Sequence, residues 1–132
     1  MGSLSNGRSG VDRLLAEARQ QLSRVDAAQT RQILADGGLL VDIRPAAQRA
    51  EFGEVPGALI IERNNLEWRL DPEGSHRLPE AEDGERTIVI MCQEGYASSL
   101  AAASLVNLGR KNSTDLDGGY VAWAAAGFPT TV

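Results

Sequence analysis

Apolar residues near the start of the chain recur with the spacing of an α-helix. Five of them lie on one side of the segment 11–22: Val11, Leu14, Leu15, Ala18 and Leu22. Residues three and four positions apart share a helix face, and Asp12 is of a type that caps helices, so we expect a helix with this N-cap. The segment 25–38 predicts a second helix, which Asp26 begins and Gly37 ends.

Short apolar runs further along the chain have the character of strands. Three of them are LLVDI at 39–43, GALII at 57–61 and TIVIM at 87–91, and a weaker one lies within STDLDGG at 113–119. The run TIVIM has no polar alternation, which is typical of a strand that is buried on both faces. Each run predicts one strand of a sheet.

Helical stretches follow the third and fourth runs. The stretch SSLAAASLVNLG, residues 98–109, predicts a helix that Ser98 or Ser99 caps. The stretch YVAWAAAG, residues 120–127, predicts a short helix with Trp123 in the core. Helices that alternate with strands supply right-handed crossover connections, so the pattern predicts an α/β domain with a mainly parallel sheet.

The segment 62–85 interrupts this alternation. It is polar, acidic and rich in turn-forming residues, so we expect it to be mostly surface loop. Trp68 and Leu70 are expected to anchor its beginning against the core, and His76 is expected to be a solvated loop residue.

The charge balance limits the classes of partner. The 132 residues include 18 acidic and 13 basic side chains, which gives a net charge of −5 and argues against nucleic acid or an anionic membrane surface as a partner. No window resembles a membrane span or a signal peptide, so we expect a cytoplasmic protein. Residues 1–10 are interpreted as a flexible tail or a remnant of cloning, residues 11–24 as a helical extension, and residues 25–132 as one domain.

The chain contains one cysteine and one histidine, Cys92 and His76. A single cysteine cannot form an internal disulfide. These two residues are also too few for a structural zinc site, so we expect no metal.

Cys92 stands where a buried strand meets a glycine turn and a helix start. In parallel sheets, ligands bind outside the carboxyl ends of the strands, and Cys92 follows TIVIM at such an end. We expect the N–H groups of the next six residues to curl around the sulfur and stabilise a thiolate, because Gly95 can adopt a positive φ. The pattern therefore predicts an exposed, nucleophilic sulfur, although a lone cysteine is also often an inert small side chain. The six residues are Gln93, Glu94, Gly95, Tyr96, Ala97 and Ser98.

Four motifs resemble, in order, those of rhodanese-like single-domain sulfurtransferases. The family's Asp-x-Arg strand resembles LLVDIRP at 39–45, and its Gly-His-Ile-Pro-Gly-Ala turn resembles FGEVPGALII at 52–61. The active-site loop is similar to CQEGYASS at 92–99, and the closing Gly-Gly…Trp…Gly-x-Pro signature to LDGGYVAWAAAGFPTT at 116–131. The resemblance covers about residues 25–132 and leaves the N-terminal helix outside it.

The resemblance implies a single α/β domain with a five-stranded, mainly parallel sheet, flanked by helices, in which Cys92 is the catalytic residue. The cysteine would take a sulfane sulfur from thiosulfate, a persulfide or a polysulfide, and pass it to cyanide, a thiol or a protein acceptor. Covalent transfer in two steps needs neither a metal nor an organic cofactor. Asp42 and Arg44 are interpreted as a structural hydrogen-bond network near the loop, with anion attraction by Arg44 as the alternative.

Two departures from the family pattern bear on the donor. Glu54 stands where the family turn has His, and the Cys92 loop contains Glu94 and no Lys or Arg. A carboxylate that faces the pocket repels a dianion, so we expect weak use of thiosulfate and a preference for a persulfide, polysulfide or protein donor. Tyr96 is expected either to restrict the donor or to pack against the following helix.

Two other functions compete with sulfur transfer. Phosphatases and arsenate reductases related to this fold place an Arg six residues after the Cys, where this chain has Ser98, so a phosphoryl group would lack its bidentate clamp. Rhodanese-like domains also serve as non-catalytic binding or regulatory modules, typically with the Cys replaced. This second alternative stays open.

Overall fold

The computed structural model describes residues 9–131. Two 3-10 turns, Arg63–Asn65 and Pro79–Ala81, flank the short helix α4. The helices and strands follow one another as α1 (Gly10–Gln20), α2 (Ala27–Ala35), β1 (Leu39–Asp42), α3 (Ala46–Phe52), β2 (Leu59–Ile60), α4 (Leu66–Leu70), β3 (Ile88–Met91), α5 (Ala97–Leu108), β4 (Ser113–Asp115) and α6 (Gly119–Ala125).

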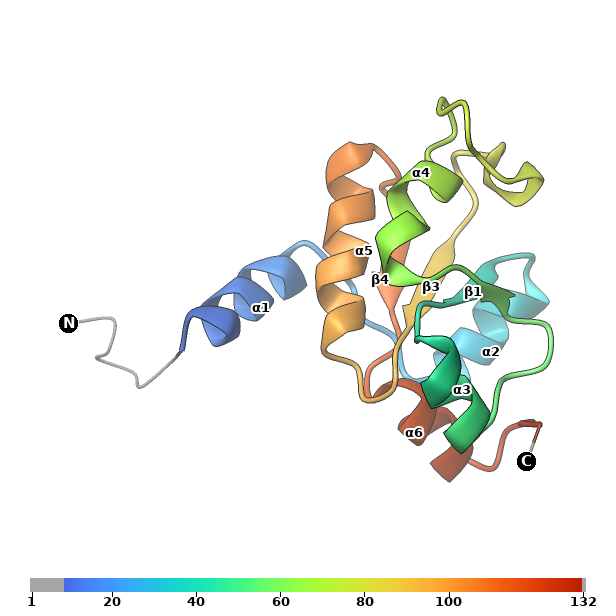
Figure 1. The fold of residues 1–132 in the computed structure, drawn as a ribbon. Helices are drawn as coiled ribbons and strands as arrows, with labels where there is room; N and C mark the ends of the chain where they lie inside the picture. The colour runs from blue at the N-terminus through green and yellow to red at the C-terminus, as the bar shows by residue number, and fades with distance from the viewer. Residues whose placement is uncertain (1–8, 132) are drawn as a thin grey trace.

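The sheet is parallel and has β3 near its middle, with the strand order β2-β1-β3-β4 (Figure 1). The expected number of strands, five, is wrong: the described residues form four. The place of a fifth strand beside β4 is taken by a single bridge between Val25 and Leu116. Pairing ends there because the next residue, Asp26, already caps α2 by accepting a hydrogen bond from the backbone of Gln29.

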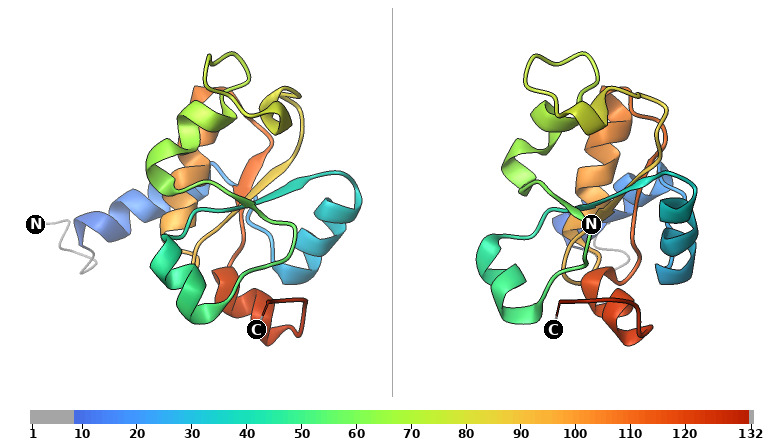
Figure 2. Two further views of the ribbon diagram at one scale, coloured as in Figure 1. Left: turned by 45° about the vertical axis from the view of Figure 1, so that its right-hand side comes forward. Right: turned by 90° about the vertical axis from the view of Figure 1, so that its right-hand side faces the viewer.

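Helices cover both faces of the sheet, as the alternation of elements predicted (Figure 2). Ile88 and Ile90 of β3 pack in the cluster that includes α4 and α5, whereas Val89 and Met91 pack in the cluster that includes α2 and α6. All four side chains of β3 are buried, which confirms that this strand has two covered faces.

The carboxyl ends of three neighbouring strands meet at one edge of the sheet. Asp42 at the end of β1 is paired with Met91 at the end of β3, and Asp115 at the end of β4 is paired with Ile90. Cys92 follows β3 directly, so an acidic residue on each adjacent strand lies beside the start of its loop. In Figure 1, α3, α6 and the first turn of α5 gather beyond this edge.

The helix caps differ from those expected at two places. Ser9 caps α1, and Asp12 is its capping-box partner three residues later rather than the N-cap. Helix α5 begins at Ala97 after Tyr96, without a side-chain cap. Ser98 and Ser99 lie inside the first turn of this helix, where their hydroxyls donate to Asp115 of β4 instead of capping the backbone.

Helix α1 runs out from the domain beside α5 (Figure 1). Of its expected apolar face, only Ala18 is buried, while Val11 and Leu14 are exposed. Helix α1 includes Gly10, and residues 1–8 of the expected tail lie outside the described residues. None of the helices within residues 9–131 is long and apolar enough to cross a membrane.

The segment 62–85 contains more structure than the sequence suggested. Leu66 and Leu70 of α4 are buried as a pair one turn apart, whereas Trp68, on the opposite side, is 63% exposed, so the expectation that Trp68 anchors the segment is wrong. The buried guanidinium of Arg110 donates to the carbonyl oxygens of Leu70 and Ala81 and thereby ties both ends of the loop to the core.

The start of α6 packs directly on the chain that follows β3. Tyr120 donates its backbone N–H to the carbonyl oxygen of Cys92 at 2.9 Å, and Val121 donates to that of Gln93 at 3.1 Å. Gly119 makes this approach feasible, because a Cβ there would collide with the Cys92 carbonyl oxygen, and its φ of +61° is strained for other residues.

The substitution Gly119→Ala should therefore disturb the Cys92 loop. We expect it to lower the free energy of unfolding by about 3 kcal/mol, from positive φ and the backbone collision together. Gly127→Ala is the matched control, because Gly127 also has a positive φ but has open space where a Cβ would lie, so it should cost only about 1 kcal/mol. Urea unfolding of both variants measures the difference, and equal losses would contradict this account.

Candidate active site

Cys92 lines a cleft of about 460 Å³ at the carboxyl edge of the sheet. The cleft lies among α3, α5 and α6, and its lining residues are Gln48, Phe52, Cys92, Gln93, Glu94, Tyr96, Ala97 and Val121. The expectation of an exposed sulfur needs correction, because Cys92 is only 7% exposed. The residue packs in the core cluster that includes α4 and α5, and it also lines the cleft.

Two backbone N–H groups point at the sulfur. Gly95 donates to Sγ of Cys92 at 3.2 Å, and Ser98, in the first turn of α5, donates at 3.3 Å. The loop reaches this shape through Gly95, whose φ is +93° and where a Cβ would lie 2.7 Å from the backbone nitrogen of Gly118. Converging N–H dipoles favour an anion, so the loop can hold a thiolate or a bound anionic sulfur.

The remaining residues of the expected cradle do not contact the sulfur through hydrogen bonds in the structure. Gln93 is half-buried and points its side-chain oxygen at Arg44. Glu94, Tyr96 and Ala97 are exposed, and all three line the cleft. The loop thus divides into two residues that bind the sulfur and others that shape the entrance.

An aspartate–arginine pair from β1 holds one side of the loop. Arg44 forms an ion pair with Asp42, with 2.7 Å between Nη2 and Oδ2, and both side chains are buried. Its Nη1 donates to Oε1 of Gln93 at 2.9 Å, and its Nη2 donates to the carbonyl oxygen of Gly53 at 2.8 Å. The guanidinium also stacks over the ring of Tyr120 at 4.3 Å. Arg44 is therefore placed to fix the loop rather than to face the cleft.

A second aspartate–arginine pair, which sequence reasoning missed, holds the other side. Asp115 is fully buried at the end of β4 and accepts from the hydroxyls of Ser98 and Ser99 at 2.7 and 2.8 Å. Arg24 donates its Nε to Asp115 at 2.9 Å and its Nη2 to the carbonyl oxygen of Gly95 at 2.9 Å. One sequence signal could have pointed to Asp115: like Asp42, it ends a strand that neighbours TIVIM. Nothing local pointed to Arg24, which lies 91 residues from Asp115 in the sequence.

The Arg24 guanidinium is charged within this network. Burial lowers the pKa of Arg24, but the hydrogen bond and charge of Asp115, with the charges of Asp117 and Cys92, outweigh that effect and raise the pKa above its ordinary value. The guanidinium therefore stays positively charged beside the Gly95 carbonyl.

The entrance of the cleft is apolar and acidic. Phe52, Tyr96 and Val121 are large side chains that remain exposed around it. Glu94 is the one acidic residue in the lining, and none of the described lining residues is Lys or Arg. Nearby, Glu54 occupies the position of the family's His and is paired with Arg49 at 3.0 Å.

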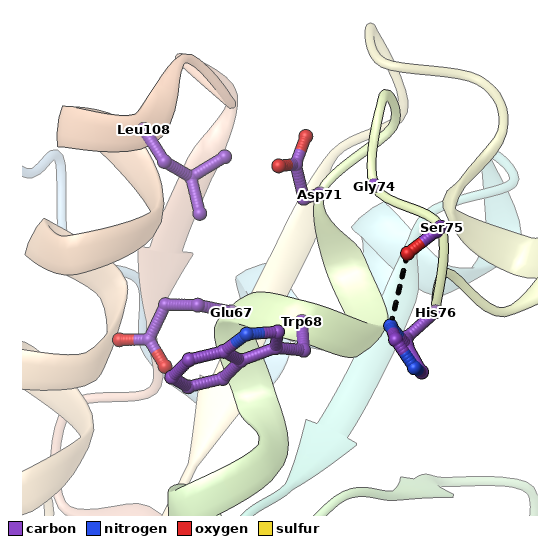
Figure 3. Close-up of a pocket in the computed structure, with 7 residues that line it drawn as sticks. All are labelled: Glu67, Trp68, Asp71, Gly74, Ser75, His76 and Leu108. Atoms are coloured by element: carbon purple, nitrogen blue, oxygen red, sulfur yellow. Dashed lines mark hydrogen bonds between the residues drawn. The ribbon is translucent and has the colours of Figure 1, made fainter.

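A second hollow lies on another side of the domain, between α4, the end of α5 and the loop at residues 71–78 (Figure 3). Its carboxylate Glu67 already binds Arg63 and the hydroxyl of Ser104, and its histidine, His76, contacts the hydroxyl of Ser75. Cys92 does not line it. Within the described residues, no group of three or more His, Cys, Asp or Glu side chains could hold a metal ion. The Cys92 cleft is therefore the candidate site.

Comparison with known proteins places this site in a family. A sulfurtransferase from Allochromatium vinosum is 36% identical over 82% of this chain and 94% of its own length. The thiosulfate sulfurtransferase GlpE of Pseudoalteromonas translucida is 32% identical over 77% of this chain and 89% of its own length. A protein of unknown function from Rhodopseudomonas palustris, described as a possible tyrosine phosphatase, superposes with a TM-score of 0.83 at 28% identity over 92% of this chain and 94% of its own length.

The family model of the rhodanese-like domain matches residues 26–126, which confirms the resemblance drawn from the four motifs. The match contains Cys92, its loop and both aspartates of the carboxyl edge. It begins after α1, which therefore lies outside it. The chain belongs to the rhodanese-like domain family.

Proposed function

We propose that the protein is a sulfurtransferase that carries a sulfane sulfur on Cys92. The observation that supports this best is the pair of N–H groups, from Gly95 and Ser98, directed at Sγ within a cleft. The names of the relatives from Allochromatium vinosum and Pseudoalteromonas translucida agree with this activity.

Transfer takes place in two displacement steps. The Cys92 thiolate attacks the outer sulfur of the donor, so a new S–S bond forms and the rest of the donor leaves with the electron pair of the broken bond, as sulfite from thiosulfate or as a thiolate from a persulfide. An acceptor nucleophile, such as cyanide or a thiolate, then attacks the outer sulfur and releases the Cys92 thiolate. No net electrons are needed, and the sequence of steps requires no metal or organic cofactor.

The loop contributes to both steps through its backbone. The Cys92 thiolate is the nucleophile of the first step and the leaving group of the second. N–H groups that stabilise it raise its population before the first step and help it to leave in the second. Because Sγ is recessed, the outer sulfur of a persulfide on Cys92 would extend towards the cleft, where an acceptor can approach. The exposed side chains of Phe52, Tyr96 and Val121 favour acceptors or donors with an apolar part next to the sulfur.

A phosphatase function is not supported by the same geometry. Six residues after Cys92 stands Ser98, and its hydroxyl is engaged by the buried Asp115. A buried carboxylate at this position disfavours a phosphate dianion, and no guanidinium replaces the bidentate clamp there. The description of the Rhodopseudomonas palustris structure thus does not carry over to this chain on the basis of its residues.

The sulfur-carrying role predicts a defined change in mass. Incubation with a polysulfide or glutathione persulfide should add one sulfur atom to the intact protein, and cyanide should remove it. Cys92→Ser should show no gain, because the chain has no other thiol. Intact-mass spectrometry measures both. A wild-type protein that gains no sulfur under these conditions would contradict transfer and favour a non-catalytic binding module.

The acidic entrance predicts that thiosulfate is a poor donor. Glu94→Gln removes the carboxylate from the cleft lining, so kcat/KM for thiosulfate, a dianion, should rise about three- to fivefold at low ionic strength. A monoanionic organic thiosulfonate, which transfers its outer sulfur and leaves as a sulfinate, should gain about twofold at most. Glu73→Gln is the matched control, since Glu73 is exposed in the loop 71–78 and does not line the cleft. An equal response to both donors, or to both substitutions, would count against this explanation of donor choice.

A further inference from the structure

Two arginines from the segment before the family domain meet at one carbonyl group of the Cys92 loop. Arg19, in the last turn of α1, and Arg24, four residues after that helix, each donate Nη2 to the carbonyl oxygen of Gly95 at 2.9 Å. Gly95 is the residue whose own N–H donates to Sγ of Cys92. The family model begins at residue 26, so both arginines lie outside it.

Each arginine is anchored by a second contact, which fixes its direction. Arg19 donates Nε to the hydroxyl of Ser99 at 3.0 Å, and its guanidinium lies 5.7 Å from the centre of the Tyr96 ring. Arg24 is held by Asp115 and by the exposed Asp117. Ser99 in turn donates to Asp115, so the two arginines, the loop and the first turn of α5 form one connected network.

Apolar burial alone does not account for how α1 is attached. Val11 and Leu14 are exposed, and Ala18 is the one buried side chain of this helix. The side chain of Arg19, in its last turn, instead donates to Ser99 and to Gly95. The segment thus contributes directed polar contacts to the loop and little to the hydrophobic core.

The charges around the sulfur show what these arginines add. The pair Asp42–Arg44 is neutral as a unit, and the buried Asp115 offsets one of the two arginine charges beside Gly95, while Asp117 pairs with Arg24 from the solvent side at 3.2 Å. Asp117 is exposed and screened by water, and Glu94 lies at the entrance. The loop between Cys92 and Ser98 has no basic residue of its own. The positive groups beside Gly95 therefore come from the segment before residue 26.

We propose that Arg19 and Arg24 are positioning residues of the sulfur site, which hold the Gly95 peptide in place and supply the positive charge that the Cys92 loop lacks. The N-terminal segment is then a working part of the site and not an appendage. This inference rests on the proposed function, because a positioned thiolate serves the protein only if Cys92 carries sulfur. The reactivity of the Cys92 thiolate can nevertheless be measured without any sulfur transfer.

The test compares the reactivity of Cys92 in variants of the full chain. Iodoacetamide reports on the thiolate without any sulfur transfer, and Cys92 is the sole thiol. Arg19→Gln removes one charge at a half-buried position. The double variant Arg24→Met with Asp115→Asn removes a half-buried cation together with its buried partner, which keeps the net charge and avoids an unpaired buried carboxylate. Arg24→Lys keeps the charge. The control double variant, Arg63→Met with Glu67→Gln, removes an ion pair between the 3-10 turn at 63–65 and α4.

We expect Arg19→Gln to alkylate about five- to tenfold more slowly than wild type near pH 7, because it removes a positive charge beside the loop. The Arg24/Asp115 double variant keeps the net charge but releases the Gly95 carbonyl, so it should alkylate about two- to threefold more slowly. Near pH 10, which lies above the ordinary thiol pKa of about 8.5, the rates should agree within about twofold. Arg24→Lys should retain most of the rate, and the control should match wild type at both pH values. Circular dichroism identifies any variant that fails to fold, and Arg19→Gln, which leaves the buried Asp115 paired, then carries the test.

Two results would overturn the inference: wild-type rates near pH 7 in folded variants, or an equal loss at both pH values, which indicates general disruption of the loop. Sulfur loading by mass is measured in parallel on the same proteins. A wild-type protein that alkylates as expected but gains no sulfur would refute the proposed function and leave the role of Arg19 and Arg24 intact.

Discussion

The site depends on keeping two backbone N–H groups aimed at one sulfur atom. A glycine-containing turn has many conformations of similar energy, so the loop after β3 needs contacts that select one of them. The structure provides these contacts from both neighbouring strands. Asp42 at the end of β1 and Asp115 at the end of β4 each hold an arginine, and each arginine reaches the loop, at Gln93 and at Gly95 respectively.

Buried ion pairs of this kind contribute little to stability, because the cost of removing both charges from water offsets much of their attraction. Here the two ion pairs fix the orientation of the Arg24 and Arg44 side chains towards the Cys92 loop. Three hydrogen bonds from Arg44 to Asp42 orient the guanidinium so that its Nη1 donates to Gln93 of the loop. Asp115 orients the first turn of α5 through Ser98, whose N–H points at the sulfur. The result is a site with a network of paired arginines and aspartates beside the Cys92 loop and a carboxylate, Glu94, at the entrance.

The sequence indicated the place of the cysteine loop better than the residues that hold this loop. The buried strand TIVIM, the glycine turn and the family motifs all pointed to Cys92, because each is a local pattern. Asp115 and Arg24 were missed, since their pairing joins segments 91 residues apart and no spacing encodes it. The predicted fifth strand does not form, because Asp26 starts a helix immediately after Val25. Trp68 was misplaced because hydrophobicity alone cannot tell which side of a five-residue helix faces the core.

The central claim is that the Gly95 and Ser98 amides bind the sulfur of Cys92, and NMR of these two backbone N–H groups tests it most directly. On conversion of Cys92 to its persulfide, the amide resonances of Gly95 and Ser98 should shift more than those of any residue outside the loop, with a smaller response at Glu94 and Tyr96. Amide signals of Gly95 and Ser98 that stay in place while the sulfur is loaded would contradict the account.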